Sequence, residues 1–201
     1  MAHDQKQEAI IQAAIKRFAH FGVAKTTMAE IAADLALSKA SLYYYFPDKM
    51  NLFAAVLQYI TDTGAKAGEE QFEKEKDPFR AIEFFLENRT EFIVKYHNIV
   101  EHLKTFNPSQ IPAEMQPVFA HLKKVELQRL TRIIEKGVQS GLFKNRDSKK
   151  TAELLFEFLE GFRLSLLLHN PNLFPDKKHF QAILKKELEF ARIFLNGLTI
   201  R

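Results

Sequence analysis

The chain has 201 residues, 46% of them hydrophobic, and a net charge of +4. This composition excludes a disordered chain. No apolar run approaches the roughly 20 residues that a membrane span needs. The lack of cysteine excludes disulfides and thiolate metal sites. The first residues lack the basic start and apolar stretch of a secretory signal, so a cytoplasmic location is expected. The positive charge favours an acidic partner such as DNA, but residues 1–50 hold six basic and five acidic residues, so bulk charge does not locate a binding face.

Apolar residues follow a helical spacing along nearly the whole chain, which predicts an all-α protein without strands. A first helix is expected from about Asp4 to His20, with Gly22 positioned to end it. Thr27 and Glu30 have the spacing of a capping box. This pattern predicts that a short second helix begins directly after Thr27.

A third short helix is predicted after a turn at residues 35–37. Ser38 is a favourable N-cap for it, and Pro47 ends it by pushing Phe46 towards an extended conformation. A fourth helix should follow Asp48. Two short helices joined by a three-residue turn are what a helix-turn-helix requires.

The remainder of the chain predicts a larger helical region. The charged run 69–78 is expected to be a solvated connection, and Pro78 suits the first turn of the next helix. The last two helices should span about Ser148–His169 and Asp176–Leu195. Residues 170–175 would separate them.

The outer face of the third helix carries side chains suited to DNA. A helix enters the major groove, which is roughly 12 Å wide, and the positions that would face it are Lys39, Ala40, Tyr43 and Tyr44, with Ser41 at the flank. An ordinary surface helix rarely exposes two adjacent tyrosines. The alternative is that these tyrosines pack against neighbouring helices.

Lys49 occupies the first position of the fourth helix. The helix dipole disfavours a cation there by a few tenths of a kcal/mol. A helix start is also a natural phosphate site, and a lysine there can add an ionic contact. A solvated lysine that tolerates the small penalty is the alternative.

Together these residues resemble the tetracycline-repressor-like (TetR) family. The match extends from Ala13 to Phe53 and reads AAIKRFAHFGVAKTTMAEIAADLALSKASLYYYFPDKMNLF. The features that carry the resemblance are the paired threonines, the IA dipeptide, the SK start of the third helix and the LYYYF–PDK–LF ending. The resemblance implies a bacterial transcription regulator that binds double-stranded DNA.

The resemblance also implies roles for individual residues. Thr26 and Thr27 would meet phosphates at the start of the second helix. Ser38, Lys39 and Ser41 would lie at the groove, with Lys39 touching base edges. Three further side chains would clamp the DNA backbone: Tyr43, Tyr44 and Lys49.

Two positions depart from the family pattern. Ala36 stands where the turn usually has glycine, which costs about 1 kcal/mol if the residue must be left-handed. Ala40 replaces the usual glycine of the recognition helix. Its methyl group either shifts the approach to DNA or contacts a thymine methyl.

The C-terminal part resembles the family's regulatory region in the segments 137–143 and 159–161. The expected organisation is a helix-turn-helix domain, residues 1–47, and a helical effector-binding and dimerisation domain, residues 48–201, joined by the helix from residue 48. For each candidate in the effector cavity, plain core packing is the alternative. The aromatic content hints at an apolar or aromatic small molecule. The candidate lining residues are Phe85, Arg89, Phe92, Tyr96, Phe119, Phe158 and Phe162.

The helix from Ser148 has two apolar stripes. One contains Leu155, Leu159, Phe162 and Leu166, and the other contains Leu154, Phe158, Gly161 and Leu168. One stripe can face the chain's own core, and the other needs a second partner. A homodimer through the last two helices is the economical choice, and a central helix buried within one subunit is the alternative.

The sequence therefore predicts a ligand-responsive repressor that binds a pseudo-palindromic operator as a dimer, without a cofactor. A regulator that activates or has no effector is the alternative. An enzyme is not expected, because G-x-S-x-G, H-E-x-x-H, a phosphate-binding glycine loop and a cysteine nucleophile are all absent. His97 and His102 lie five residues apart, which does not favour a metal site. A non-specific architectural DNA binder would need more basic surface than residues 1–50 offer.

Overall fold

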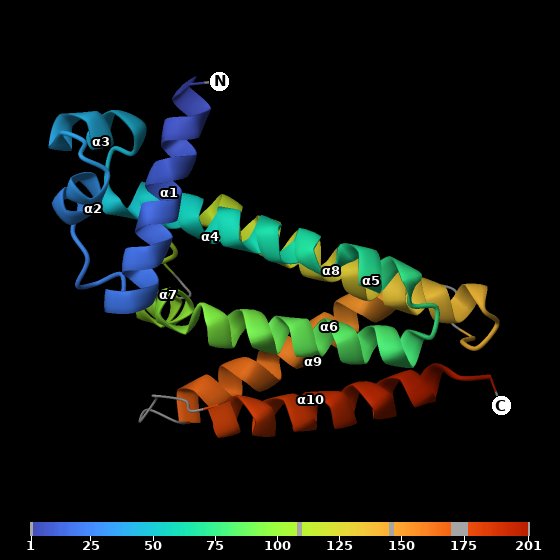
Figure 1. The fold of residues 1–201 in the computed structure, drawn as a ribbon. Helices are drawn as coiled ribbons and strands as arrows, with labels where there is room; N and C mark the ends of the chain where they lie inside the picture. The colour runs from blue at the N-terminus through green and yellow to red at the C-terminus, as the bar shows by residue number, and fades with distance from the viewer. Residues whose placement is uncertain (1, 108–109, 145–146, 170–176, 201) are drawn as a thin grey trace. The chain divides into compact units, whose positions relative to one another are not determined.

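The computed structural model describes residues 2–107, 110–144, 147–169 and 177–200, and these residues are almost entirely helical (Figure 1). An isolated antiparallel bridge between Phe143 and Thr199 is the nearest approach to a strand in this part of the chain. The all-α prediction is therefore confirmed. The helices are α1 (Ala2–Phe21), α2 (Met28–Asp34), α3 (Lys39–Tyr45), α4 (Lys49–Ala67), α5 (Glu69–Lys74), α6 (Pro78–Lys95), α7 (His97–Val100), a 3-10 helix (Glu101–Thr105), α8 (Gln116–Gln139), α9 (Ser148–His169) and α10 (Lys177–Leu198).

The chain forms two compact units. The first unit comprises residues 1–65 and 95–122, and the second unit comprises residues 66–94 and 123–201. These units are structural divisions, and the functional boundary between residues 47 and 48 stays a prediction. None of the described helices combines the length and the apolar character that crossing a membrane requires.

The first unit is built around α1, which packs against α2 and α7. Phe18 of α1 is fully buried, and its ring meets that of Phe53 from α4 edge to face at 6.2 Å. Gly22 adopts φ +81° and its N–H donates to the carbonyl of Phe18 at 3.0 Å. The predicted stop at Gly22 is confirmed, because this left-handed conformation is one that glycine adopts without strain.

The expected caps of α2 and α3 are both present. The Thr27 hydroxyl accepts from the Glu30 N–H at 3.3 Å, and the Glu30 carboxylate accepts from the Thr27 N–H at 2.7 Å. The Ser38 hydroxyl accepts from the Ser41 N–H at 3.0 Å. Between the two helices, Ala36 has φ 52° and is the one non-glycine residue with positive φ in the described chain. The strain that the alanine implied is therefore real.

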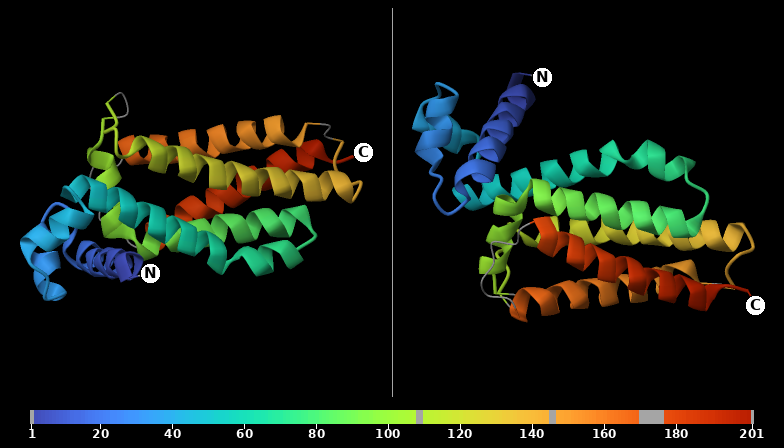
Figure 2. Two further views of the ribbon diagram at one scale, coloured as in Figure 1. Left: turned by 90° about the horizontal axis from the view of Figure 1, so that it is seen from above. Right: turned by 60° about the horizontal axis from the view of Figure 1, so that its bottom comes forward.

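The second unit has a single apolar core drawn from α5, α6, α8, α9 and α10, with Leu86, Ile133 and Leu155 fully buried. Helices α9 and α10 contact each other, and the right-hand view of Figure 2 shows them crossing, coloured orange and red. At the end of α8, a Cβ added to Gly137 would lie only 2.1 Å from the Phe143 ring. Gly137 is therefore needed so that Phe143 can fold back onto the helix.

The charged run 69–78 was expected to be a solvated connection, and this expectation is wrong. Residues 69–74 form α5, and Phe72 is buried to 2% exposure in the core of the second unit. Arg132 and Lys136 of α8 lie over the Phe72 ring at 4.9 and 5.0 Å from its centre. The Lys136 ammonium also donates to the Phe72 carbonyl at 2.8 Å. The cation–π contacts on Phe72 and the lysine at the C-terminus of α5 stabilise this helix, although its composition alone predicts a solvated segment.

Ala36→Gly should raise the free energy of unfolding by about 0.5–1 kcal/mol. Glycine relieves the left-handed strain of about 1–2 kcal/mol, and its extra freedom in the unfolded chain offsets part of this gain. Denaturant unfolding measures the change. Ala33→Gly, in an exposed helical position of α2, is the matched control and should lower stability by up to about 1 kcal/mol. Equal destabilisation by both variants would contradict the strain at Ala36.

Candidate DNA-binding interface

The turn between α2 and α3 is tight and fixed by backbone bonds. The Leu37 N–H donates to the carbonyl of Ala32 at 2.9 Å, and the Ala36 N–H donates to that of Ala33 at 3.1 Å. Ile31 on α2 and Leu42 on α3 are fully buried. The two short helices therefore share one apolar interior and have opposite faces free to be polar, which is the arrangement of a helix-turn-helix.

Arg17 holds α2 against α1, a role that local sequence patterns did not indicate. Its guanidinium donates to both carboxylate oxygens of Asp34, at 2.5 and 2.7 Å, and lies 3.5 Å from the carboxylate of Glu30. The hydrogen bond from Arg17 lowers the pKa of Asp34, and the hydrogen bonds from Thr27 lower that of Glu30. The groups are exposed, so the pair adds little stability. The two-point contact instead fixes the orientation of α2.

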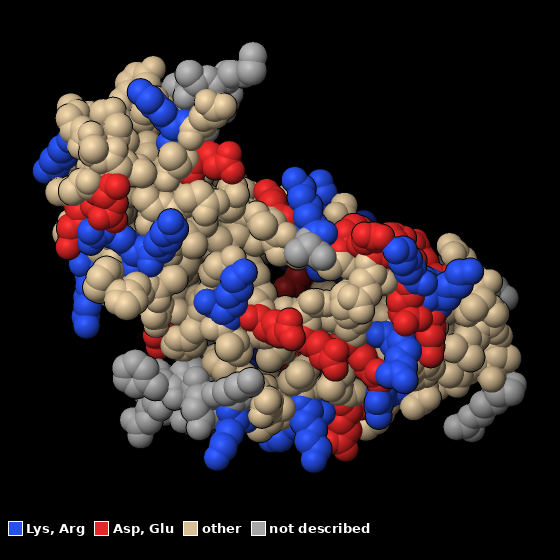
Figure 3. Space-filling model, in the orientation of Figure 1, with Lys and Arg blue, Asp and Glu red and all other residues tan. Residues whose placement is uncertain are grey.

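The positions of the charges in the first unit, rather than their sum, favour DNA. Glu30 and Asp34 are paired with Arg17, and the Asp48 carboxylate accepts from the Asn51 N–H at 2.8 Å, which lowers the pKa of Asp48. Glu8 accepts from the Tyr59 hydroxyl at 3.2 Å. On the face drawn in Figure 3, acidic and basic side chains are interspersed. These four carboxylates, Glu8, Glu30, Asp34 and Asp48, are thus engaged within the unit.

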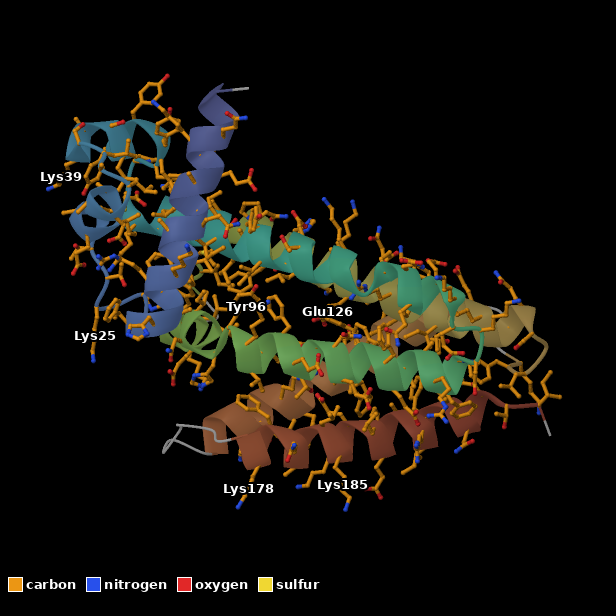
Figure 4. All side chains as sticks on the ribbon, in the orientation of Figure 1. Lys25, Lys39, Tyr96, Glu126, Lys178 and Lys185 are labelled. Atoms are coloured by element: carbon orange, nitrogen blue, oxygen red, sulfur yellow. The ribbon has the colours of Figure 1, made fainter. Side chains whose placement is uncertain are left out.

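The outer face of α3 is open to solvent. Lys39 and Ala40 are exposed, and Tyr43 and Tyr44 are 38% and 75% exposed. Figure 4 shows Lys39 pointing outwards from the helix, and its ammonium lies 5.7 Å from the centre of the Tyr43 ring. The Tyr44 ring packs edge to face on Tyr45 at 5.3 Å. This surface, Lys39, Ala40, Tyr43 and Tyr44, is called the α3 face below.

The two threonines before α2 differ in their availability. Thr26 is 1% exposed, and its hydroxyl donates to the Gly22 carbonyl at 2.9 Å. Any phosphate contact by Thr26 would therefore have to use its backbone. Thr27 is exposed, although its hydroxyl also donates to the Glu30 carboxylate at 2.8 Å. Ser38 is exposed as well, and Ser41 is half-buried.

Lys49 is half-buried, and its ammonium reaches back to the loop between α1 and α2. It donates to the carbonyls of Val23 at 3.0 Å, Thr26 at 3.1 Å and Ala24 at 3.4 Å. An ammonium has three N–H donors, so these carbonyls use all of them. Burial lowers the pKa of His102, and the positive charge of Lys49 lowers it further. The loop that carries Thr26 and Thr27 is thus anchored to the start of α4.

The candidate effector residues are divided between the two units. Phe85, Arg89, Phe92, Phe158 and Phe162 belong to the second unit, whereas Tyr96 and Phe119 belong to the first. Within the second unit, Phe85 is buried, Phe92 and Phe162 are half-buried, and Arg89 contacts the carboxylates of Glu126 and Glu160. Phe158 is 56% exposed, so it is a surface residue of the single chain.

The two stripes predicted on α9 separate in the structure. Leu155 and Leu159 are buried, whereas Leu154 and Phe158 are exposed. The Phe158 ring stacks on Phe190 of α10 at 5.7 Å. The side chains of Leu166 and Leu168, also assigned to the stripes, lie outside the described residues, as do Asn170–Pro175. The exposed apolar residues of these two helices, Leu154, Phe158 and Ile193, are called the α9–α10 face below.

Comparisons with known proteins agree with this geometry. A family model of bacterial regulatory proteins, the tetR family, matches residues 10–56. A crystal structure of a transcriptional regulator from Cytophaga hutchinsonii is 31% identical, with a TM-score of 0.84 over 97% of this chain and 99% of that one. A transcriptional regulator from Saccharomonospora viridis in complex with choline shares the fold at 16% identity, with a TM-score of 0.69 over 98% of this chain and 100% of that one.

Among curated proteins, the uncharacterized HTH-type transcriptional regulator YuxN of Bacillus subtilis is similar. It is 28% identical over 159 residues, which cover 78% of this chain. The match covers 52% of YuxN, so this chain spans about half the length of that relative.

Lys49→Ala should weaken binding to all DNA duplexes alike, because the loop that carries Thr26 and Thr27 is no longer anchored to α4. Fluorescence anisotropy at several salt concentrations measures affinity and its salt dependence. The slope of log affinity against log salt should stay unchanged, because all three N–H groups of Lys49 are used by carbonyls and no phosphate contact is lost. Lys185→Ala on α10, which removes the same charge from an outward-pointing side chain (Figure 4), is the control. A slope that falls by about one would contradict loop anchoring and show that Lys49 contacts a phosphate in the complex.

Proposed function

Because the chain belongs to the TetR family of bacterial transcriptional regulators, we propose that it is a ligand-responsive repressor that binds a pseudo-palindromic operator as a homodimer. The observation that carries the proposal is the α3 face. A short, capped helix there exposes Lys39, Tyr43 and Tyr44.

Each group on the α3 face has a chemical role towards DNA. The ammonium of Lys39 suits the O6 and N7 acceptors of guanine in the major groove. The hydroxyls of Tyr43 and Tyr44 suit phosphate oxygens, and such contacts set the register of the helix on the duplex. Ala40 leaves room for the helix to approach closely, and its methyl can meet that of thymine.

The α9–α10 face supports the dimer. Phe158 and Ile193 are 56% and 67% exposed, and Phe190 stacks beneath Phe158. Water contact with such large apolar side chains costs about 25 cal/mol per Å², and a two-fold related copy offers the same apolar surface in return. A dimer that reads two half-sites must hold its α3 helices about 34–36 Å apart.

An effector would act in the second unit, whose helices enclose Arg89 and several carboxylates. The Saccharomonospora viridis regulator of similar fold is described in complex with choline, which supports a small-molecule site in this fold. An effector releases DNA only if it binds the DNA-free conformation more tightly than the DNA-bound one. An activator, or a regulator without an effector, would have the same α3 face. Experiment must distinguish these alternatives from a ligand-responsive repressor.

Footprinting on the DNA beside the protein's own gene tests the proposal. A protected site with two inverted halves, bound at physiological salt far more tightly than random DNA of equal length, is expected. Equal affinity for operator and random DNA would instead support a non-specific binder. Transcription from the same promoter, measured with and without the protein, distinguishes repression from activation.

Lys39→Ala should relax the preference for particular base pairs. Loss of a good base contact costs about 1–3 kcal/mol at the contacted pair and little elsewhere. Binding to a set of operators that each carry one substituted pair measures the change. Lys25→Ala, another outward-pointing lysine of the first unit (Figure 4), serves as the control. A loss of affinity that is uniform across the set would mean that Lys39 contacts only phosphate.

Phe158→Glu should convert the dimer to monomers, because the substitution buries a charge in each copy of an apolar interface. Sedimentation velocity measures the mass, and circular dichroism verifies that the variant is folded. Val94→Glu places the same charge at an exposed apolar residue of α6 and should leave the dimer intact. A folded Phe158→Glu variant that is still dimeric would show that another surface forms the interface.

A further inference from the structure

Five charged side chains from four helices meet inside the second unit. They are Arg89 of α6, Glu126 of α8, Glu160 and Arg163 of α9, and Glu187 of α10. Glu187 is only 1% exposed, and the side chains of Arg89 and Arg163 are 12% and 13% exposed. Two guanidinium groups and three carboxylates, all ionised, give this cluster a net charge of −1.

The pairing within the cluster leaves one carboxylate over. Arg163 donates to both carboxylate oxygens of Glu187, at 2.5 and 3.2 Å. Arg89 donates to Glu160, whose carboxylate also lies 3.7 Å from Arg163. Glu126 lies 2.8 Å from Arg89 Nη1, but the geometry of that contact is not that of a hydrogen bond. Glu126 is therefore the carboxylate of the cluster that is ion-paired with a guanidinium, that of Arg89, without accepting a hydrogen bond from it.

The Oε2 atom of Glu126 is buried, and the side chain as a whole is 23% exposed. None of the described residues donates a hydrogen bond to its buried Oε2 atom. A buried oxygen without a hydrogen bond lowers the free energy of unfolding by about 1–3 kcal/mol, and by more when the oxygen is charged. Such a cost is usually offset by a bound partner or by function.

The electrostatics agree with an excess of negative charge. Burial, which is the largest cause, raises the pKa of Glu126 to about 7, and the carboxylates of Glu160 and Glu187 raise it further against the lowering effect of Arg89 and Arg129. Burial also raises the pKa of Glu187 to about 7. Stability is therefore lost as the pH rises from about 4.5, the ordinary pKa, to about 7, and the full cost of the two charges is present above pH 7. A positive charge placed at the cluster would offset that cost.

We infer that Glu126 is the anchor for a protonated amine of the effector, which would donate to the enclosed Oε2 atom and bring the cluster to neutrality. The regulatory meaning of this site rests on the proposed function, but the binding site can be tested without DNA. Arg89 Nη1 and Arg163 Nη1 are also buried without a hydrogen-bond acceptor among the described residues, but an anion bound there would take the fully ionised cluster from −1 to −2 in a poorly hydrated interior. Phe85 and Phe92 lie four residues before and three after Arg89 on α6, and this spacing places aromatic rings on the same helix face. A primary amine with an aromatic ring is therefore the appropriate probe.

The experiment is calorimetric titration of the full-length protein with phenethylamine hydrochloride, with 2-phenylethanol and 3-phenylpropanoate as neutral and anionic analogues. The amine should bind and raise Tm, and the two analogues should not. Glu126→Gln keeps the shape of the side chain and removes its charge, so amine affinity should fall at least tenfold. Glu135→Gln, at an exposed carboxylate on the same helix, should bind as the wild type does.

A second measurement needs no variant. Because the anchor must be ionised, amine affinity of the wild-type protein should rise roughly tenfold between about pH 6 and pH 8, where the probe stays protonated. Absence of amine binding at millimolar concentration, unchanged affinity in a folded Glu126→Gln protein, preferential binding of the anionic analogue, or affinity independent of pH would each overturn the inference. The footprinting experiment tests the proposed function independently of amine binding. An amine can bind a protein that has no operator, and a repressor can respond to another ligand.

Discussion

The presentation of α3 depends on the burial of Leu42 against the core of the first unit. A helix of seven residues does not hold its shape in water by itself, because nucleation is costly and few hydrogen bonds follow. Leu42 is fully buried and Phe46 is 4% exposed, so one side of α3 is fixed by packing. The other side is then free to carry Lys39, Tyr43 and Tyr44 without contributing to stability. The surface available for DNA therefore exists because the opposite surface is apolar.

The same separation of tasks explains how a unit with nearly balanced charge can favour a polyanion. The carboxylates of Glu30 and Asp34 face Arg17, and that of Asp48 caps α4. Each is held by a local donor, whereas Lys39 and Lys25 point into solvent (Figure 4). Phosphate attraction acts over a Debye length of about 10 Å at moderate salt. Over that distance the placement of charges, and not their total, decides which face attracts a duplex.

Features that depend on neighbouring residues in the sequence were predictable. The capping box at Thr27, the N-cap at Ser38 and the stop at Gly22 each need only a few consecutive residues, and all three are present. The strain at Ala36 was predictable in the same way once the turn was placed. The apolar stripes of α9 were also visible, but which stripe faces solvent depends on packing against α10 and could not be read from α9 alone.

Features that join distant residues were missed. Arg17 and Asp34 are 17 residues apart, and Lys49 reaches carbonyls 23–26 residues before it. Helix α5 was misread because its stability comes from Arg132 and Lys136 on α8, some 60 residues further on, rather than from its own composition. Arg89 was chosen from sequence as an effector residue, but its two partner carboxylates, Glu126 and Glu160, could not be identified. No local pattern connects Glu126, Glu160 and Glu187.

The charge cluster also constrains how a signal could leave the second unit. Its members lie on α6, α8, α9 and α10, so compensating the charge of Glu126 changes the balance of forces on four helices at once. One of these helices, α8, begins in the first unit at Gln116 and continues into the second unit from Lys123. A helix transmits a tilt or rotation along its length, because its backbone hydrogen bonds make it stiff over several turns. A ligand that altered the packing of α8 at the cluster would thus act on a helix that has residues in both units.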